Sequence, residues 1–149
     1  MNRFKLIISV LSFLLSVICF TVPAHSAEKF VVKYDKTIDI TKNTSTVNVD
    51  GYTVRVDMSE PAEPFRELVF RVFIEKDKKP VELAHGYMQF NMSMDMGLYK
   101  TKLFKANTGY TAKVTLPKCI FGGKRWYVKL VFSADGGEFS KVFLFDMKE

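Results

Sequence analysis

Hydrophobic and polar residues alternate with a period of two over much of this chain. The run from 52 to 58 reads YTVRVDM and places four apolar side chains on one face, namely Tyr52, Val54, Val56 and Met58. Such alternation is typical of a β-strand with one face packed on a core. It recurs at 68–74, 110–116 and 126–132, and no segment after residue 27 has a sustained helical period. The pattern therefore predicts an all-β protein.

Turn residues divide these runs at short intervals. Asp50-Gly51 joins two β-rich runs, which is a strong sequence signal for a hairpin, and Asn107-Thr108-Gly109 and Asp135-Gly136-Gly137 mark two more turns. Pro61 and Pro64 lie in a segment that favours a loop between sheets. We therefore expect an immunoglobulin-like antiparallel β-sandwich of about seven to eight strands.

The N-terminal segment has the features of a secretory signal peptide. Arg3 and Lys5 precede an uncharged apolar run, which ends in the small-residue segment PAHSA at 23–27. A membrane anchor is the alternative, because the run approaches the roughly 20 residues that span a bilayer. We predict a signal peptide at 1–27, a single β-sandwich domain at 28–149, and a periplasmic or other extracytoplasmic location. Membrane contact is expected only through the signal segment if it stays uncleaved.

The charge of the chain argues against a role with nucleic acids. The formal net charge is +6, but basic and acidic residues are interleaved, as in RVFIEKDKKP. Interleaved charges are typical of a solvated surface. Export and the lack of an Arg-rich stripe or nucleic-acid motif point the same way, so we expect no nucleic-acid partner.

The most informative stretch is HGYMQFNMSMDMG at 85–97. Its thioethers are soft donors of the kind that favours Cu(I) over hard cations, and they come from Met88, Met92, Met94 and Met96. In one regular strand these methionines would share a face, which equally describes ordinary core packing. His85 has the opposite parity and would lie about 23 Å from Met92, which separates it from a joint site.

Cys119 is the cysteine that remains after signal cleavage. It has no partner for a disulfide within the processed chain, although an exported protein meets oxidising conditions. Its thiol is therefore buried and inert, joined to another protein, or a metal ligand. The sequence pattern leaves these three readings open.

From about 68 to 146 the chain resembles the FixH-like/YtkA-like group of exported β-sandwich domains. The resemblance rests on LVFRVFIEKDKKPV, NMSMDMG, NTGYTAKVTLP followed by KC, KRWYVKLVF and the final aromatic strand. Some members of this group are associated with copper handling and respiratory-oxidase assembly. The resemblance implies four candidate ligands for Cu(I), which are Met92, Met94, Met96 and Cys119.

Two functions follow as expectations. The first is an exported protein that binds Cu(I) through its methionine-rich strand for copper delivery, tolerance or oxidase assembly, with a delivery or assembly partner. The alternative is a metal-free interaction or structural module of a bacterial envelope complex. We do not expect an enzyme. His85 is the one histidine left after signal cleavage, and the sequence has no Gly-rich phosphate loop, Ser-His-Asp motif or His-based metal signature.

Overall fold

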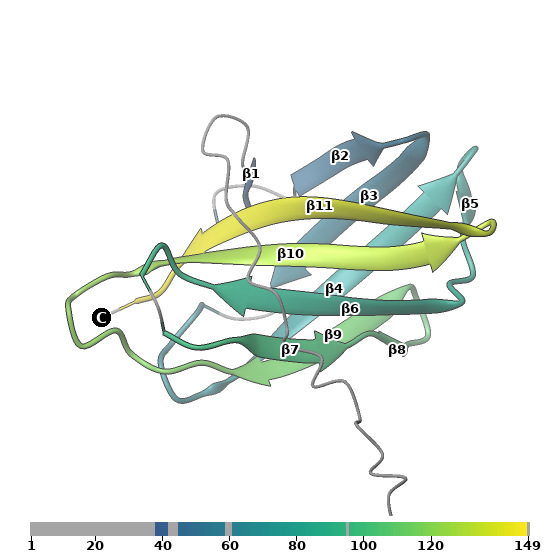
Figure 1. The fold of residues 1–149 in the computed structure, drawn as a ribbon. Helices are drawn as coiled ribbons and strands as arrows, with labels where there is room; N and C mark the ends of the chain where they lie inside the picture. The colour runs from purple at the N-terminus through teal and green to yellow at the C-terminus, as the bar shows by residue number, and fades with distance from the viewer. Residues whose placement is uncertain (1–37, 42–44, 59–60, 95, 149) are drawn as a thin grey trace, which may run out of the picture.

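The computed structural model describes residues 38–41, 45–58, 61–94 and 96–148 (Figure 1). The predicted signal peptide at 1–27 lies outside these residues. Within the described part of the chain, no helix is long and apolar enough to cross a membrane.

The first sheet has the strand order β1-β11-β10-β6-β7. Its strands are β1 (Ile38–Asp39), β11 (Gly137–Asp146), β10 (Arg125–Ala134), β6 (His85–Asn91) and β7 (Tyr99–Lys102). Strand β1 pairs in parallel with β11, and the other neighbours are antiparallel. The long hairpin of β10 and β11 thus forms the middle of this sheet.

The second sheet has the order β2-β3-β4-β9-β8, with β5 paired to β4. Its strands are β2 (Ser45–Val49), β3 (Tyr52–Met58), β4 (Glu67–Lys76), β5 (Lys79–Pro80), β8 (Phe104–Lys105) and β9 (Tyr110–Thr115). All its pairs are antiparallel. As the apolar pattern of 68–74 suggests, β4 is a central strand.

The predicted all-β sandwich is confirmed. Strands β3-β4-β9 and β11-β10-β6-β7 follow the order of the A-B-E and G-F-C-C′ strands of an immunoglobulin-like sandwich. The described residues form eleven strands, more than the seven or eight expected. The difference comes from β1, β5 and β8, which are strands of only two residues each. Such short ladders leave almost no periodic signal in a sequence.

Two hairpins show why the turn signals are reliable. Asp50 and Gly51 have φ of 48° and 88°, and Asp135 and Gly136 have φ of 50° and 77°. Positive φ at both central residues is the geometry of a type I′ turn, which Asp-Gly adopts readily and which matches the twist of the flanking strands. These turns fix the registers of β2–β3 and β10–β11.

The core lies between the two sheets and is rich in aromatic side chains. Phe70 of β4 lies 5.3 Å from the ring of Phe90 and 5.6 Å from that of Phe145, both in the opposite sheet. The even-numbered residues of β10 face this core, as alternation predicts. Tyr127 has the opposite parity and lies outside this core, yet it is only 5% exposed. It lies on a central strand flanked by β6 and β11, which explains its burial.

Candidate metal centre

The methionine-rich stretch is not one regular strand. Strand β6 ends at Asn91, and the chain reverses through 92–98 to enter β7 at Tyr99, with Gly97 at a φ of 87°. The condition under which all four methionines share a face, one regular strand through Met96, is therefore not met beyond Asn91. The reason is topological, because β6 and β7 are antiparallel neighbours and the residues between them must turn.

The three candidate methionines have different surroundings. Met92 is 5% exposed and belongs to the core, Met94 is 36% exposed, and Met96 is half-buried and packs against the core. The core reading thus holds for Met92 and in part for Met96. Met94 instead presents its thioether at the surface, where a solute can reach it.

Cys119 lies in the connection between β9 and β10, at the same end of the sandwich as the connection between β6 and β7. Gly122 donates its backbone N–H to the Cys119 carbonyl oxygen at 3.2 Å, which closes a tight turn. The Cys119 side chain is a free thiol and only 3% exposed. Sequence reasoning left burial and metal binding as alternatives, and the side chain is buried.

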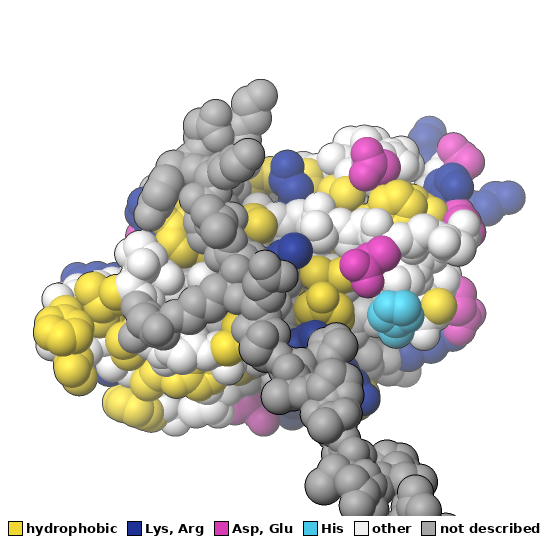
Figure 2. All heavy atoms as spheres, viewed as in Figure 1, with side chains coloured by type: hydrophobic (Ala, Val, Ile, Leu, Met, Phe, Trp, Pro, Cys, Tyr) yellow, Lys and Arg dark blue, Asp and Glu magenta, His cyan; other side chains and the backbone are white. Residues whose placement is uncertain are grey.

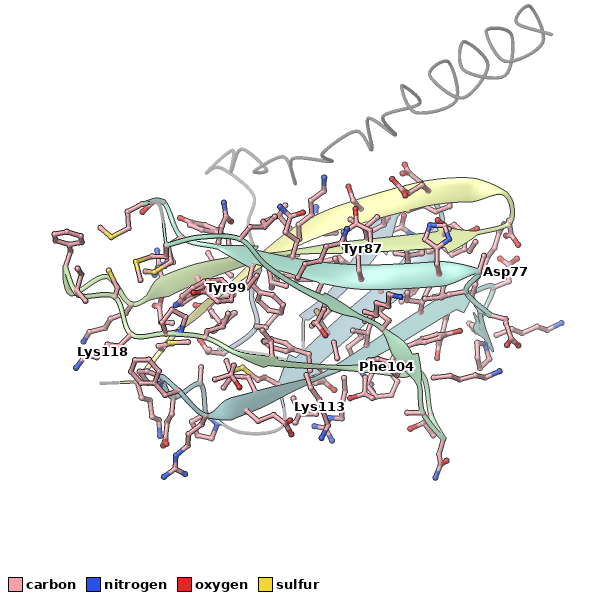
Figure 3. The ribbon with its side chains drawn as sticks, turned by 60° about the horizontal axis from the view of Figure 1, so that its bottom comes forward. Asp77, Tyr87, Tyr99, Phe104, Lys113 and Lys118 are labelled. Atoms are coloured by element: carbon pink, nitrogen blue, oxygen red, sulfur yellow. The ribbon has the colours of Figure 1, made fainter. Side chains whose placement is uncertain are left out.

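The thiol of Cys119 and the thioether of Met94 are in direct contact. The Cys119 S–H donates to Met94 Sδ, with 3.1 Å between the two sulfurs. Figure 3 shows sulfur atoms gathered at the end of the molecule where Lys118 is labelled. Two residues that are 25 positions apart in the sequence are thereby brought together by loops from different strand connections.

Gly123 makes room for this group. A methyl group added at Gly123 would lie 3.0 Å from Met92 Cε and 3.4 Å from Cys119 Sγ. Met92 and the thiol therefore pack against the same side of one glycine. The structure brings Met92, Met94 and Cys119 together, while Met96 is a half-buried side chain that packs against the core. We call Met92, Met94 and Cys119 the sulfur cluster.

The C-terminal segment lies beside Cys119, which sequence reasoning did not predict. Met147, which is 6% exposed, lines a small pocket together with Cys119, Gly123 and Lys124. Its backbone N–H donates to the Lys124 carbonyl oxygen at 2.9 Å. No periodic pattern links Met147 to a loop so far back in the chain, so only the tertiary fold reveals its place.

The donor set of this end is soft. Among the described residues, no group of three or more His, Cys, Asp or Glu side chains has a geometry that would hold a metal ion. That test concerns imidazole, thiolate and carboxylate donors and does not cover thioethers. Thiolate and thioether donors without carboxylates suit Cu(I) and disfavour Mg²⁺ or Ca²⁺.

The sulfur separation fits a shared ion after a small shift. Two sulfurs each about 2.3 Å from one ion lie about 4 Å apart at trigonal or tetrahedral angles. The observed 3.1 Å is shorter, so the pair would have to open by roughly 1 Å. Met94 lies on an exposed loop and has a flexible side chain, which can supply this movement.

One acidic side chain close in sequence to Met147 is already engaged. Asp146, one residue before Met147, forms a bidentate pair with Arg125 at 2.9 and 3.0 Å. The hydrogen bond and the charge of Asp146 raise the pKa of Arg125 above its ordinary value. This carboxylate is thus held by a guanidinium rather than offered to a cation.

His85 lies at the opposite end of β6 from the sulfur cluster. Its Nε2 is 2.8 Å from Ser133 Oγ and 3.8 Å from Glu138 Oε2, and its imidazole is exposed. Its strand partner is Ser133, whereas Asn91 at the other end pairs with Tyr127. The structure therefore does not bring His85 to the candidate ligands, in agreement with the parity argument.

Comparisons with known proteins add little to this geometry. No family model matches the chain, and no curated protein matches it. An engineered protein of known crystal structure is similar, with 11% sequence identity and a TM-score of 0.44. The match covers 63% of this chain and 20% of the engineered chain. The resemblance to FixH-like/YtkA-like domains remains a prediction.

Proposed function

We propose that this protein binds Cu(I) at the sulfur cluster in an extracytoplasmic compartment. The observation that supports the proposal most is the contact between Cys119 Sγ and Met94 Sδ, with Met92 packed beside the same thiol. Three soft donors converge from two loops, which is more than core packing of isolated residues requires. The proposed role is copper binding for delivery, tolerance or oxidase assembly, without catalysis.

Each ligand has a distinct part in this proposal. Cys119 supplies the thiolate and is screened from water, which protects a copper–thiolate bond from competing ligands. Met94 is the exposed donor through which the ion enters and leaves. Met92 is a buried third donor held by the core, and Met96 is not needed to complete this set.

The proposed partner follows from the chemistry of the ligands, and the proposed export follows from the expected signal peptide. Cu(I) that is held by two thioethers and one thiolate, one of them at the surface, is suited to exchange with another protein's sulfur ligands. A copper-delivery or respiratory-oxidase assembly partner would then receive the ion at this end of the sandwich. The signal peptide expected at 1–27 would bring the domain to that compartment.

Anaerobic Cu(I) titration against a competing chelator tests the proposal. We expect the natural protein to take one Cu(I), and the combined variant with Cys119→Ser and Met92, Met94 and Met96→Leu to lose it. Met88→Leu is the matched control, since Met88 is fully buried on β6 away from the sulfur cluster. Binding that survives in the combined variant would reject this site.

A metal-free interaction module is the second candidate. The observation that favours it is the deep burial of Met92 and Cys119, which is also what simple packing would produce. In that case each Met→Leu change should alter the free energy of unfolding by less than about 1.5 kcal/mol. The protein should also fail to take Cu(I) from a weak chelator. The titration above therefore separates the two functions.

A further inference from the structure

The loop that carries Cys119 also carries two prominent apolar side chains. Ile120 is 84% exposed and Phe121 is 77% exposed, although they are adjacent to a buried residue. Both are the central residues of the turn from Cys119 to Gly122, and their side chains point into solvent. Figure 2 shows hydrophobic side chains gathered at this end of the molecule, where the connection into β10 lies in Figure 1.

A third exposed apolar side chain comes from another loop. Phe65 is 70% exposed and has a φ of 62°, a conformation that bulky residues rarely adopt. Its backbone N–H donates to the Leu116 carbonyl oxygen at 2.9 Å, which ties it to the start of the β9–β10 connection. Backbone strain of this kind concentrates at functional sites. We call Phe65, Ile120 and Phe121 the apolar tip.

The charges around the apolar tip are positive. Lys118 and Lys124 are exposed on either side of Ile120 and Phe121, and Lys148 lines the same small pocket. Two acidic side chains in the neighbouring segments are bound to arginines, since Glu63 lies 3.0 Å from Arg66 and Asp146 pairs with Arg125. Among the described residues of these segments, the lysines therefore give an excess of positive charge.

We propose that the apolar tip inserts into the interface of an anionic lipid membrane. Protruding apolar and aromatic side chains flanked by lysines are the surface that a bilayer interface accepts, with the rings among the acyl chains and the ammonium groups at the phosphates. The tip is a convex turn of a few side chains, whereas a stable protein interface needs about 800 Å² from each partner. This contact goes beyond the expectation that only the signal segment touches the membrane, and it does not require a metal.

Site-specific fluorescence on the full chain tests the proposal. Cys19 and Cys119 are replaced by serine, and an environment-sensitive fluorophore is attached to Phe121→Cys or, as a control, Phe104→Cys. Phe104 is 59% exposed on β8, away from the tip, as Figure 3 shows by its distance from Lys118 along the sandwich. The background lacks the thiol of the sulfur cluster, so its outcome is independent of copper binding.

With vesicles of phosphatidylcholine and phosphatidylglycerol, we expect a blue shift of the label at 121 and none at 104. Lys118→Glu with Lys124→Glu should weaken the partitioning of the 121 label by about 10-fold or more, because each lysine near an anionic surface contributes about fivefold. Lys78→Glu with Lys79→Glu, both exposed where the β4–β5 turn enters β5, should change it less than twofold.

Three results would contradict the membrane proposal, the first two its insertion step and the third its anionic lipid. One is an unshifted label at 121 with anionic vesicles, which would leave the tip as a surface for a protein. The second is an equal shift at 121 and 104, which would mean that another part of the chain holds the protein on the vesicle. A shift that is as large with pure phosphatidylcholine would reject the role of the lysines.

Discussion

The two ends of the sandwich use side chains in opposite ways. At one end, Tyr52 and Lys76 both donate hydrogen bonds to Asp135, at 2.8 and 2.7 Å. At the other, the sulfur cluster offers soft donors, with three exposed apolar side chains around it. At the first end the Asp135 carboxylate is bound by two groups of the same chain, whereas at the second the Met94 thioether and three apolar side chains lie at the surface. The proposed copper site and the proposed membrane contact both lie on the loops of this second end.

The largest expected effect is on Cu(I) affinity, which should fall after a substitution at the sulfur cluster and not after one at the other end. Cys119→Ser should weaken Cu(I) binding by more than about 100-fold, beyond the 10- to 100-fold typical of outer-shell changes. His85→Ala, at the other end, should change the affinity less than twofold because its imidazole partners Ser133. Chelator competition on both variants measures the contrast, and equal losses would mean that the metal does not bind at the sulfur cluster.

The next effect distinguishes the structural methionine from the exposed one. Met92→Ala should lower the free energy of unfolding by about 2–5 kcal/mol, because it removes a core side chain and leaves a cavity. Met94→Ala should change it by no more than about 0.5 kcal/mol. Urea unfolding of both variants is the measurement. A large loss for Met94→Ala would show that its loop is part of the core.

A smaller effect compares one glycine at each end. An added methyl group meets Met92 Cε at 3.0 Å in Gly123→Ala and Leu103 Cδ1 at 2.7 Å in Gly86→Ala. Both variants should lose about 1–3 kcal/mol of stability through overpacking. Only Gly123→Ala should also alter the alkylation rate of Cys119, measured with iodoacetamide in the folded protein. A changed rate in Gly86→Ala as well would indicate a global rather than a local disturbance.

The smallest effect concerns the polar end and acid. The hydrogen bond from Lys76 and then that from Tyr52, with the charge of Lys76, hold the pKa of Asp135 below its ordinary value of 3.8. A lowered folded-state pKa gives stability that is present above pH 3.8 and is lost as pH falls through the folded value. Asp135→Asn should flatten the stability profile below about pH 4, measured by urea unfolding. An unchanged profile would mean that the hydrogen bonds to Asp135 do not contribute to the pH dependence of stability.

Most of the fold could be predicted because its signals are local. The alternation in 52–58 and 126–132 and the Asp-Gly turns state which residues face the core and where strands reverse. The two-residue strands escaped because a pair of residues has no period. The end of β6 at Asn91 escaped because it is set by the antiparallel pairing with β7 rather than by the methionines themselves.

The candidate site was only partly predictable. A resemblance in the LPKC segment suggested Cys119, but its contact with Met94 depends on how two loops meet at the end of the sandwich. Alternation placed Met92, Met94 and Met96 on one face, which the turn after Asn91 undoes. Met147 and Gly123 could not be found from the sequence, since their roles arise from packing alone.

The most direct test of the central claim is the X-ray absorption spectrum of the Cu(I)-loaded protein at the copper edge. Binding at the sulfur cluster predicts a first shell of sulfur scatterers alone, at about 2.3 Å. The spectrum should lose its sulfur scatterers in the variant with Cys119→Ser and Met94→Leu. A first shell of nitrogen or oxygen in the natural protein would contradict the claim that Cys119, Met94 and Met92 hold the ion.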